Sequence, residues 1–325
     1  MSETTTYRQA IARAIADEIA GDDDVFVLGE DVGRAGGVFK TTEGLFERFG
    51  ELRVRDTPIS EQAIIGTAIG SALKGLRPVA EIMFADFAGV CFDQIANELA
   101  KYRYMTGGQV TLPVTVRLAN GAGGGFGAQH SQAVENWFLN ISGLKIVVPA
   151  TPADAYRLLR ASVRDPNPVL YFEHKGLLNL KGELPTDGFT ELGGAEVVRR
   201  GDAATVVASQ LMRHRTVDAA RQLSTEGIEV ELIDPRILVP FDTAAVTKSI
   251  ERTNRLVVVQ ESPRGGSWGA SVIAQISEEH FELLDAPPCL VGGDETPIPY
   301  ARALEEAWLP STERIAERIR RTLAW

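Results

Sequence analysis

Glu61 is one of two residues whose type and surroundings suit proton transfer. It follows Pro58 and Ser60 and precedes residues 62–70 (QAIIGTAIG), which are mostly apolar or small. Proline is excluded from helix interiors and serine is a favoured N-cap, so we expect a helix to begin at this acid. The helix dipole alone could favour an acid at this position, by about 0.3–1 kcal/mol. Alternatively, its apolar neighbours could bury it, and a buried, unpaired carboxylate has a raised pKa suited to donating a proton.

His130 is the second such residue and one of only four histidines. It ends a glycine-rich segment, residues 120–130 (NGAGGGFGAQH). An imidazole titrates near neutrality, so His130 could exchange a proton in a cleft. It could equally be a polar loop residue satisfied by its neighbours. The glycines would let the backbone approach a ligand or a neighbouring subunit.

The same glycine segment also fits a dinucleotide-binding pattern, G-x-G-x-x-A, at residues 123–128. It follows a strand expected over residues 114–118, as that pattern requires. However, the next expected strand, residues 144–148, leads into Pro149 and Ala150, without an acid to hold a ribose hydroxyl. This absence disfavours a nicotinamide dehydrogenase.

Composition and charge narrow the class of protein. The chain has 325 residues, of which 44% are hydrophobic and 24% charged, an ordinary composition for a globular protein. Its net charge of -11 argues against nucleic acid as a main partner, because phosphate binding needs clustered lysine and arginine. No apolar run approaches the ~20 residues that a membrane span needs. The first residues resemble no signal or transit peptide, and Cys91 and Cys289 lack metal-ligand spacing, so we expect a cytoplasmic protein.

Apolar runs alternate with helical patterns along the chain, which predicts an α/β fold with parallel sheets. Residues 179–194 are polar and contain Gly and Pro, as a linker would. We therefore expect two doubly wound domains, residues 1–180 and 195–325, joined by a linker over residues 181–194. The first should contain strands over 25–28, 79–84, 114–118, 144–148 and 169–172, and helices over 7–19, 60–74 and 92–105 and from 151. The second should contain strands over 204–208, 230–233, 256–260 and 289–291, and helices over 213–226 and 311–323.

Eight short motifs occur in a characteristic order: 28–32 (LGEDV), 36–39 (GGVF), 55–61 (RDTPISE), 75–79 (GLRPV), 92–95 (FDQI), 104–108 (YMTGG), 129–132 (QHSQ) and 165–168 (DPNP). Through them the chain resembles, nearly end to end, the beta subunit of the thiamine-diphosphate-dependent decarboxylase component of 2-oxo acid dehydrogenase complexes. The resemblance implies a transketolase-like pyrimidine-binding domain followed by a transketolase C-terminal-like domain.

The resemblance also implies roles for individual residues. Glu61 matches the acid that hydrogen-bonds the cofactor's aminopyrimidine ring and favours its imino tautomer, which decides between the two interpretations of this acid. Phe87 matches the aromatic residue that packs on the pyrimidine, although simple core packing would also explain it, and Ile59 matches a neighbouring contact. Glu30 is implied to lie near Glu61, so the two carboxyl groups should titrate together. His130 matches a histidine that lines the substrate entrance and assists acyl transfer to lipoate.

A potassium site in some family members is matched here by Val114, Ser162, Val163, Asp165 and Asn167. From the residues alone, 165–168 would be an ordinary turn. The family holds the cofactor's diphosphate through magnesium with a GDG motif and a distant asparagine. This sequence has no GDG, and its nearest match, residues 201–203 (GDA), lies in the second expected domain.

The missing motif implies half a site. The resemblance supplies the other half from an alpha subunit that brings magnesium and the diphosphate, in an alpha2-beta2 heterotetramer that acylates a lipoyl-bearing dihydrolipoyl acyltransferase. The substrate stays open between pyruvate, branched-chain 2-oxo acids and acetoin. Residues 83–95 are similar to acetoin dehydrogenase beta subunits, whereas residues 140–145 (NISGLK) depart from the usual His-x-Pro pattern. A non-catalytic assembly subunit of the same fold is an alternative, and a self-sufficient transketolase-like enzyme is disfavoured by the missing motif.

Overall fold

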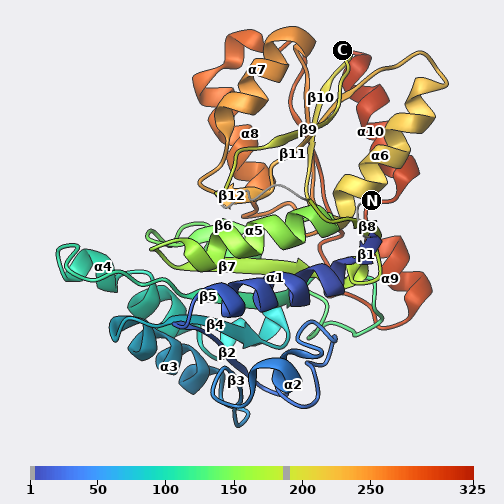
Figure 1. Cartoon of the computed structure of the whole chain (residues 1–325). Coiled ribbons are helices and arrows are strands. Elements are labelled where there is room, and N and C mark those ends of the chain that lie inside the picture. Colours follow the sequence, from blue (N-terminus) through green and yellow to red (C-terminus); the bar gives the residue numbers. More distant parts are fainter. Residues whose placement is uncertain (1–3, 186–190) are drawn as a thin grey trace. The chain divides into compact units, whose positions relative to one another are not determined.

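A computed structural model describes residues 4–185 and 191–325 of the chain (Figure 1). These residues form two compact units, which are described separately. The first takes the described residues up to Asn120 and those from Trp137 to Leu192, and the second takes Gly121–Asn136 and Gly193–Trp325. The change of unit after Leu192 falls inside the expected linker, residues 181–194. The segment Gly121–Asn136, which the sequence analysis placed in the first domain, packs with the second unit instead.

The first unit is built on a parallel sheet with the strand order β6-β7-β5-β4-β2-β3. These strands are β2 (Val25–Gly29), β3 (Val54–Asp56), β4 (Arg77–Ile82), β5 (Thr115–Asn120), β6 (Lys145–Val147) and β7 (Val169–His174). Strands β2, β5 and β7 are buried along their whole length, as expected for a sheet covered on two faces. Short strands β1 (Thr4–Thr6) and β8 (Lys181–Glu183) pair antiparallel beside it.

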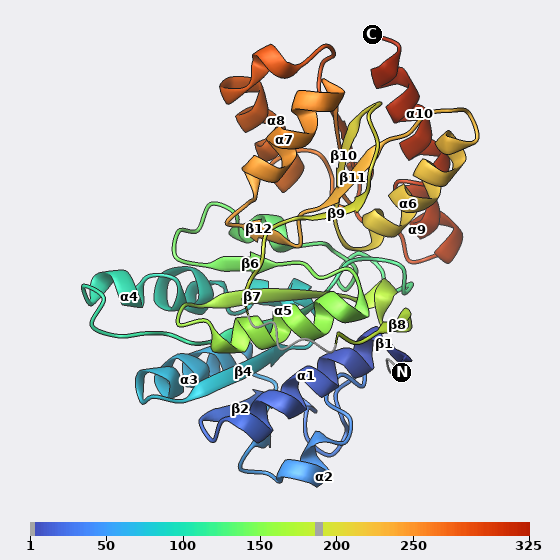
Figure 2. The ribbon, with the colours of Figure 1, turned by 45° about the horizontal axis from the view of Figure 1, so that its top comes forward.

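Helices α1 (Tyr7–Gly21) and α5 (Pro152–Arg164) pack side by side, as Figure 2 shows, and α3 (Glu61–Leu73) packs on β4. The unit also contains α2 (Leu45–Phe49), α4 (Tyr102–Met105), the 3-10 helices η1 (Ala85–Gly89) and η4 (Lys175–Leu177), and the π-helix η2 (Gln94–Leu99). The single helix expected over 92–105 is therefore wrong, because it divides into η2 and α4. At this break the Gly143 backbone lies so close that a Cβ there would be 2.0 Å from the Ala100 carbonyl oxygen.

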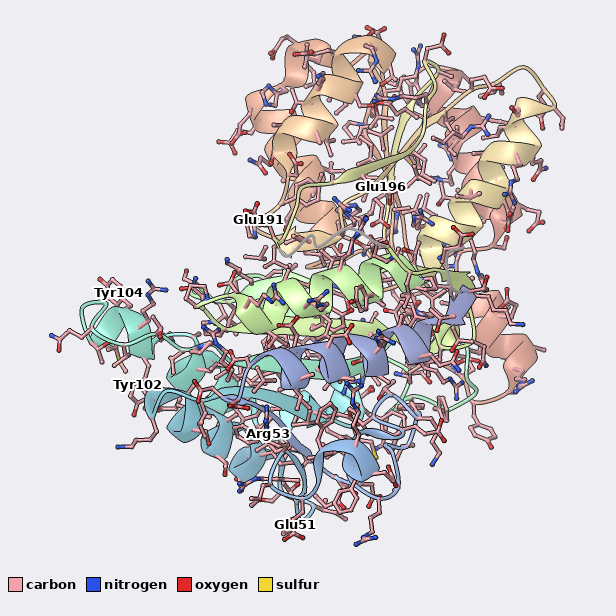
Figure 3. The ribbon with its side chains drawn as sticks, in the orientation of Figure 1. Glu51, Arg53, Tyr102, Tyr104, Glu191 and Glu196 are labelled. Carbon is pink, nitrogen blue, oxygen red and sulfur yellow. The ribbon has the colours of Figure 1, made fainter. Side chains whose placement is uncertain are left out.

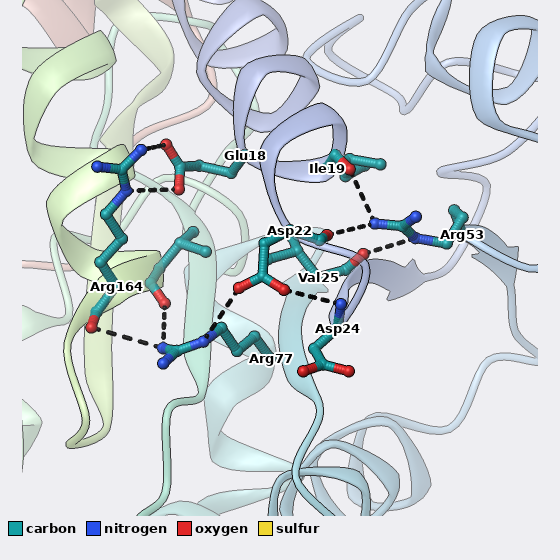
Figure 4. A network of polar contacts seen from close by, with 9 residues as sticks. Glu18, Ile19, Asp22, Asp24, Val25, Arg53, Arg77 and Arg164 are labelled. Carbon is teal, nitrogen blue, oxygen red and sulfur yellow. Dashed lines mark hydrogen bonds and ion pairs between the residues drawn. The ribbon is translucent and has the colours of Figure 1, made fainter. Parts of the chain in front are cut away.

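Two arginines link the amino-terminal side of this sheet to α1 and α5 by hydrogen bonds and an ion pair (Figure 4). Arg53 donates to the carbonyl oxygens of Ile19, Asp22 and Val25 at 2.9, 2.7 and 2.8 Å. Arg77 donates to the Val163 carbonyl at 3.2 Å and pairs with the Asp22 carboxylate at 3.3 Å. These bonds satisfy carbonyl groups at the ends of both helices, so the sheet edge opposite the carboxyl ends of the strands is fixed.

The second unit has a sheet with the order β14-β13-β10-β11-β9, in which only β9 runs antiparallel to its neighbour. Its strands are β9 (Glu196–Arg199), β10 (Thr205–Ala208), β11 (Glu231–Asp234), β13 (Leu256–Val259) and β14 (Cys289–Val291), and the short strand β12 (Ile237–Val239) lies between β11 and β13 in the chain. Its helices are α6 (Gln210–Ser224), α7 (Thr243–Thr253), α8 (Trp268–Glu279), η5 (Phe281–Leu283), α9 (Arg302–Trp308) and α10 (Thr312–Leu323). The 3-10 helix η3 (Glu135–Phe138) starts in this unit and ends in the first.

Both units thus have the α/β architecture that the sequence predicts. Ala122, from the glycine segment, belongs to the buried core of the second unit. Among the helices of residues 4–185 and 191–325, none is both long and apolar enough to cross a membrane.

Candidate functional site

Glu30, Glu61 and Phe87 follow the carboxyl ends of three neighbouring strands. Glu30 comes directly after β2, Glu61 begins α3 shortly after β3, and Phe87 lies in η1 after β4. Strand β2 pairs in parallel with both β3 and β4, so the three ends meet at one edge of the sheet. Open α/β sheets bind ligands at this edge. The strand order therefore gathers the residues that the sequence assigned to cofactor binding in the first unit.

Glu61 is the first residue of α3, as predicted, but it is less buried than the apolar residues beside it in the sequence suggest. Ser60 occupies the N-cap position without a capping hydrogen bond from its side chain. Glu61 is only half-buried, and Ile59 is 77% exposed. Of the apolar neighbours, Ile64 and Ile65 point into the core, which leaves the start of the helix at the surface. Of the two alternatives that the residues left open, burial of Glu61 by its apolar neighbours is not found within this chain.

The charge of Glu61 nevertheless acts on its neighbours. The pKa of Glu30 is raised by burial and further by the charges of Asp31 and Glu61. Burial, with the charge of Glu61 adding to it, raises the pKa of the Cys91 thiol to about 12, so this thiol stays protonated at neutral pH. Glu30 and Glu61 thus lie close enough for the charge of Glu61 to raise the pKa of Glu30.

Three aromatic rings, one of them Phe87, pack against one another after the end of β4. The half-buried ring of Phe87 lies 5.5 Å from that of Phe84, which meets Phe39 edge-on at 5.3 Å between ring centroids. The buried Lys175 ammonium lies 5.5 Å from the centroid of Phe84. The Cys91 thiol is hydrogen-bonded to the Phe87 carbonyl at 3.9 Å. Phe87 thus packs on Phe84 while part of its surface stays accessible.

A buried ion triad on the strands went unnoticed in the sequence. Arg117 on β5 pairs with Glu81 on β4 at 2.6 Å and with Glu173 on β7 at 2.5 Å, and all three side chains are almost fully buried. Burial raises the pKa of Glu173, while Arg117 lowers it. Gly29 lies opposite Glu81, where a Cβ would be 2.9 Å from the Glu81 carbonyl oxygen. The sequence signal was a charged residue inside each of three otherwise apolar strands.

The glycine segment is held by carboxylates of its own unit. The amides of Gly123 and Gly125 donate to Glu305 of α9 at 3.0–3.3 Å, and the Ala122 amide donates to Glu261 at 2.5 Å. Amides that would cradle a phosphate in a dinucleotide site are thus bound to carboxylates. His130 is half-buried, and its backbone N–H donates to the Gly127 carbonyl at 3.3 Å. His130 belongs with this loop to the second unit, whereas Glu61 belongs to the first.

The residues matched to a potassium site lie near the carboxyl end of α5. Asp165 accepts from the backbone and side-chain nitrogens of Asn167 at 2.9 and 3.0 Å, which is the ordinary turn that the sequence alone predicted. Asp165 also pairs with Lys145, and the Asn167 side chain accepts from Arg103.

Three other groups of this set also form hydrogen bonds. The carbonyl groups of Val163 and Val114 accept from Arg77 and from the Val169 amide at 3.2 and 2.9 Å, and the Ser162 hydroxyl donates to the Leu158 carbonyl at 2.6 Å. Arg77 and the Lys145 partner of Asp165 place positive charge where a cation would need negative charge. The potassium site stays a prediction.

Comparison with known proteins adds independent information. Residues 3–181 match the family "Transketolase, pyrimidine binding domain" and residues 193–315 match "Transketolase, C-terminal domain". The chain is similar to the acetoin:2,6-dichlorophenolindophenol oxidoreductase subunit beta of Bacillus subtilis, with 42% identity over 97% of this chain and 96% of that protein. It is also similar to the 2-oxoisovalerate dehydrogenase subunit beta of the same organism, with 43% identity and 97% of each chain covered.

Two further similarities concern another substrate and the fold. The pyruvate dehydrogenase E1 component subunit beta of Gracilaria tenuistipitata var. liui is 41% identical over 98% of this chain and 99% of that protein. A solved structure described as a split-gene transketolase, inactive beta4 tetramer, superposes with a TM-score of 0.80 at 25% identity, over 98% of each chain.

Proposed function

Because this chain belongs to the transketolase-like family of beta subunits of thiamine-dependent 2-oxo acid dehydrogenases, we propose that it supplies the aminopyrimidine half of a thiamine diphosphate site. The observation that carries the proposal is the convergence of Glu61, Glu30 and Phe87 at the carboxyl edge of the first sheet. A carboxylate beside an accessible aromatic ring suits a flat, nitrogen-bearing heterocycle.

Each residue has a task in this proposal. Glu61 would hold the proton on a nitrogen of the pyrimidine ring, and Phe87 and Ile59 would contact the ring. Glu30, whose pKa is raised by burial and by the charges of Asp31 and Glu61, responds when Glu61 changes its charge. When bound, the cofactor supplies a nucleophilic carbon and an electron sink.

The other half of the site is assigned to an alpha subunit in an alpha2-beta2 heterotetramer. The sequence lacks the GDG motif for the diphosphate and its magnesium ion. Apolar side chains stand exposed in the first unit, including Ile59 at 77% and Tyr104, which projects from α4 and is 90% exposed (Figure 3). Exposed apolar residues of this size suit a protein interface. A structurally similar split-gene transketolase chain is described as an inactive tetramer, which supports a need for a partner.

The reaction we assign is decarboxylation of a 2-oxo acid of the pyruvate type, followed by acyl transfer to the lipoyl group of an acyltransferase. His130 assists the acyl transfer. Cleavage of acetoin is the second candidate, favoured by residues 83–95 and by the similarity to acetoin oxidoreductase beta subunits. Relatives acting on these different substrates are 41–43% identical to the chain, so overall identity does not select the substrate. Cys91 and Cys289 are free thiols, which supports the cytoplasm as the compartment.

Co-expression with the alpha subunit tests the proposal. The heterotetramer should oxidise pyruvate, branched-chain 2-oxo acids or acetoin in a dye-linked assay that requires thiamine diphosphate. Glu61→Gln should leave assembly intact and abolish this activity, because an amide cannot accept and release the ring proton. Glu47→Gln, on α2, is the control. Dye reduction at the unchanged rate by Glu61→Gln would overturn the role of this acid.

The isolated chain offers a second test, which does not depend on activity. Calorimetric titration with thiamine diphosphate and magnesium should give no measurable heat of binding for the beta chain alone and tight binding for the heterotetramer. Tight binding to the beta chain alone would refute the division of the site between two polypeptides.

A further inference from the structure

The loop that carries His130 has a backbone that only glycine readily adopts. The φ angles of Gly121, Gly123, Gly125 and Gly127 are +81°, +98°, +69° and +77°. Left-handed glycines alternating with other residues turn successive amide N–H groups into one concavity, which binds anions. Glycine has the greatest conformational freedom in the unfolded chain, so such a loop needs strong contacts to hold one conformation.

Two buried carboxylates provide these contacts at different places. Glu261, 7% exposed, receives the Ala122 amide, and Ala122 itself lies in the core, so this bond fixes the root of the loop. Glu305, 3% exposed, receives the amides of Gly123 and Gly125 on its two carboxylate oxygens. Hydrogen bonds to a charged group are stronger than those between neutral groups. Glu305 therefore holds the part of the loop that leads toward His130.

Two backbone hydrogen bonds connect the rest of the loop to His130. The Gly121 amide donates to the Gln132 carbonyl at 3.1 Å, which joins the two ends of the loop. The His130 amide donates back to the Gly127 carbonyl at 3.3 Å, two residues beyond Gly125. A shift of Gly125 would thus be passed through Gly127 to the His130 backbone.

We propose that Glu305 is a positioning residue, whose carboxylate fixes the glycine loop and thereby the location of His130 during acyl transfer to the lipoyl group. This inference rests on the role of His130 in the proposed function. Glu305 itself touches neither substrate nor cofactor in this assignment. Its contribution is to keep a flexible loop in the one conformation that presents the imidazole.

The test compares Glu305→Gln with Glu306→Gln in the heterotetramer. The glutamine keeps the size of the side chain and one accepting oxygen, but it loses the negative charge, and its NH2 group cannot accept from a glycine amide. Glu306 is the matched control, because it lies on the same helix, is largely exposed and pairs with Arg215. Hydrogen exchange of the peptide spanning residues 121–132 should accelerate in Glu305→Gln and stay unchanged in Glu306→Gln.

Activity should divide in the same way. Dye-linked oxidation should stay within about twofold of wild type in Glu305→Gln, while acylation of a free lipoyl domain should slow by roughly 10- to 100-fold, the cost of misplacing a group by about 1 Å. The double variant Glu305→Gln/His130→Ala should be no slower in acylation than His130→Ala alone. Equal losses in both assays, or losses that multiply in the double variant, would reduce Glu305 to a structural residue and overturn the inference.

The His130→Ala variant distinguishes failure of the proposed role of His130 from failure of the positioning role of Glu305 alone. If it acylates the lipoyl domain at the wild-type rate, the proposed role of His130 fails, and this inference fails with it. If His130→Ala is slow while Glu305→Gln is normal, the inference alone fails and the proposed function stands.

Discussion

Replacing Arg117 with methionine should destabilise the first unit more than any other single change at the triad. Within the triad, Glu81 and Glu173 both pair with the Arg117 guanidinium, and all three side chains are almost fully buried. Removing one partner of a buried pair costs about 3–5 kcal/mol, because a buried charge is left without compensation. In a unit of roughly 150–250 residues each kcal/mol lowers the melting temperature by about 2–4 °C. We therefore expect a decrease of about 6–20 °C.

The decrease should depend on pH in a definite direction. The folded-state pKa of Glu173 is raised above its usual 4.5, chiefly by burial, and Arg117 opposes that rise. Without Arg117 the folded pKa rises further, so the unfolded chain ionises first as the pH increases. The carboxyl group then destabilises the fold above its unfolded pKa, and this cost disappears below it. Arg117→Met should consequently lose more stability at about pH 8 than at about pH 5.

Calorimetric melting of the single and triple variants is the assay. Glu81→Gln/Arg117→Met/Glu173→Gln removes all three charges together, and it should be more stable than Arg117→Met alone at neutral pH. Arg13→Met is the control, because Arg13 pairs with Asp17 at 3.0 Å on an exposed helix surface and should contribute at most about 1 kcal/mol. An unchanged melting temperature in Arg117→Met, or a triple variant less stable than the single one, would refute this reasoning.

Two further predictions concern the glycine loop and the residues matched to a potassium site. Gly125→Ala should lower the free energy of unfolding by about 1–2 kcal/mol, because residue 125 has φ +69°. No atom lies closer than 3.7 Å to the added Cβ, so backbone strain dominates the effect. Gly265→Ala is the control, because position 265 has open space and no positive φ, and it should leave the calorimetric melting temperature unchanged. Potassium chloride should raise the melting temperature no more than choline chloride at equal ionic strength, because a specific ion would stabilise the folded chain by mass action. A rise that appears only with potassium would support the ion site, and a neutral Gly125→Ala would show that the loop relaxes freely.

The positions of the principal site residues were predictable, whereas their exposure was not. Glu30 and Phe87 each follow an apolar run, and parallel strands place such residues at one edge, whereas β3, the strand before Glu61, has the sequence VRD and was not predicted. The alternative in which apolar neighbours bury Glu61 is not realised, because residues before and after a helix start point in different directions. Ile59 precedes the helix and is exposed, while Ile64 is one turn inside it and buried.

Contacts between distant residues lay beyond the reach of sequence patterns. The ion pairs of Arg117 depend on strand register, which sets Arg117 opposite Glu81 and Tyr171. The bond between Gly123 and Glu305 spans 182 residues, and no spacing rule connects a glycine loop to a helix so far along the chain. The order of motifs could identify His130 as a candidate, but not the carboxylate that holds its loop.

The same long-range bond has a consequence for the order in which the protein is made. Synthesis proceeds from the amino terminus, and domains generally fold as they emerge from the ribosome. The strands of the first unit are complete once β7 and β8 have been translated, with Thr4 paired to Glu183. The glycine loop lies between β5 and β6 but is anchored by Glu305, 20 residues before the last residue, Trp325. The His130 loop can therefore take its final form only after α9 has been translated, later than the strands of the first unit, and a chain that stops short of α9 would keep the sheet of its first unit while leaving this loop without its anchor.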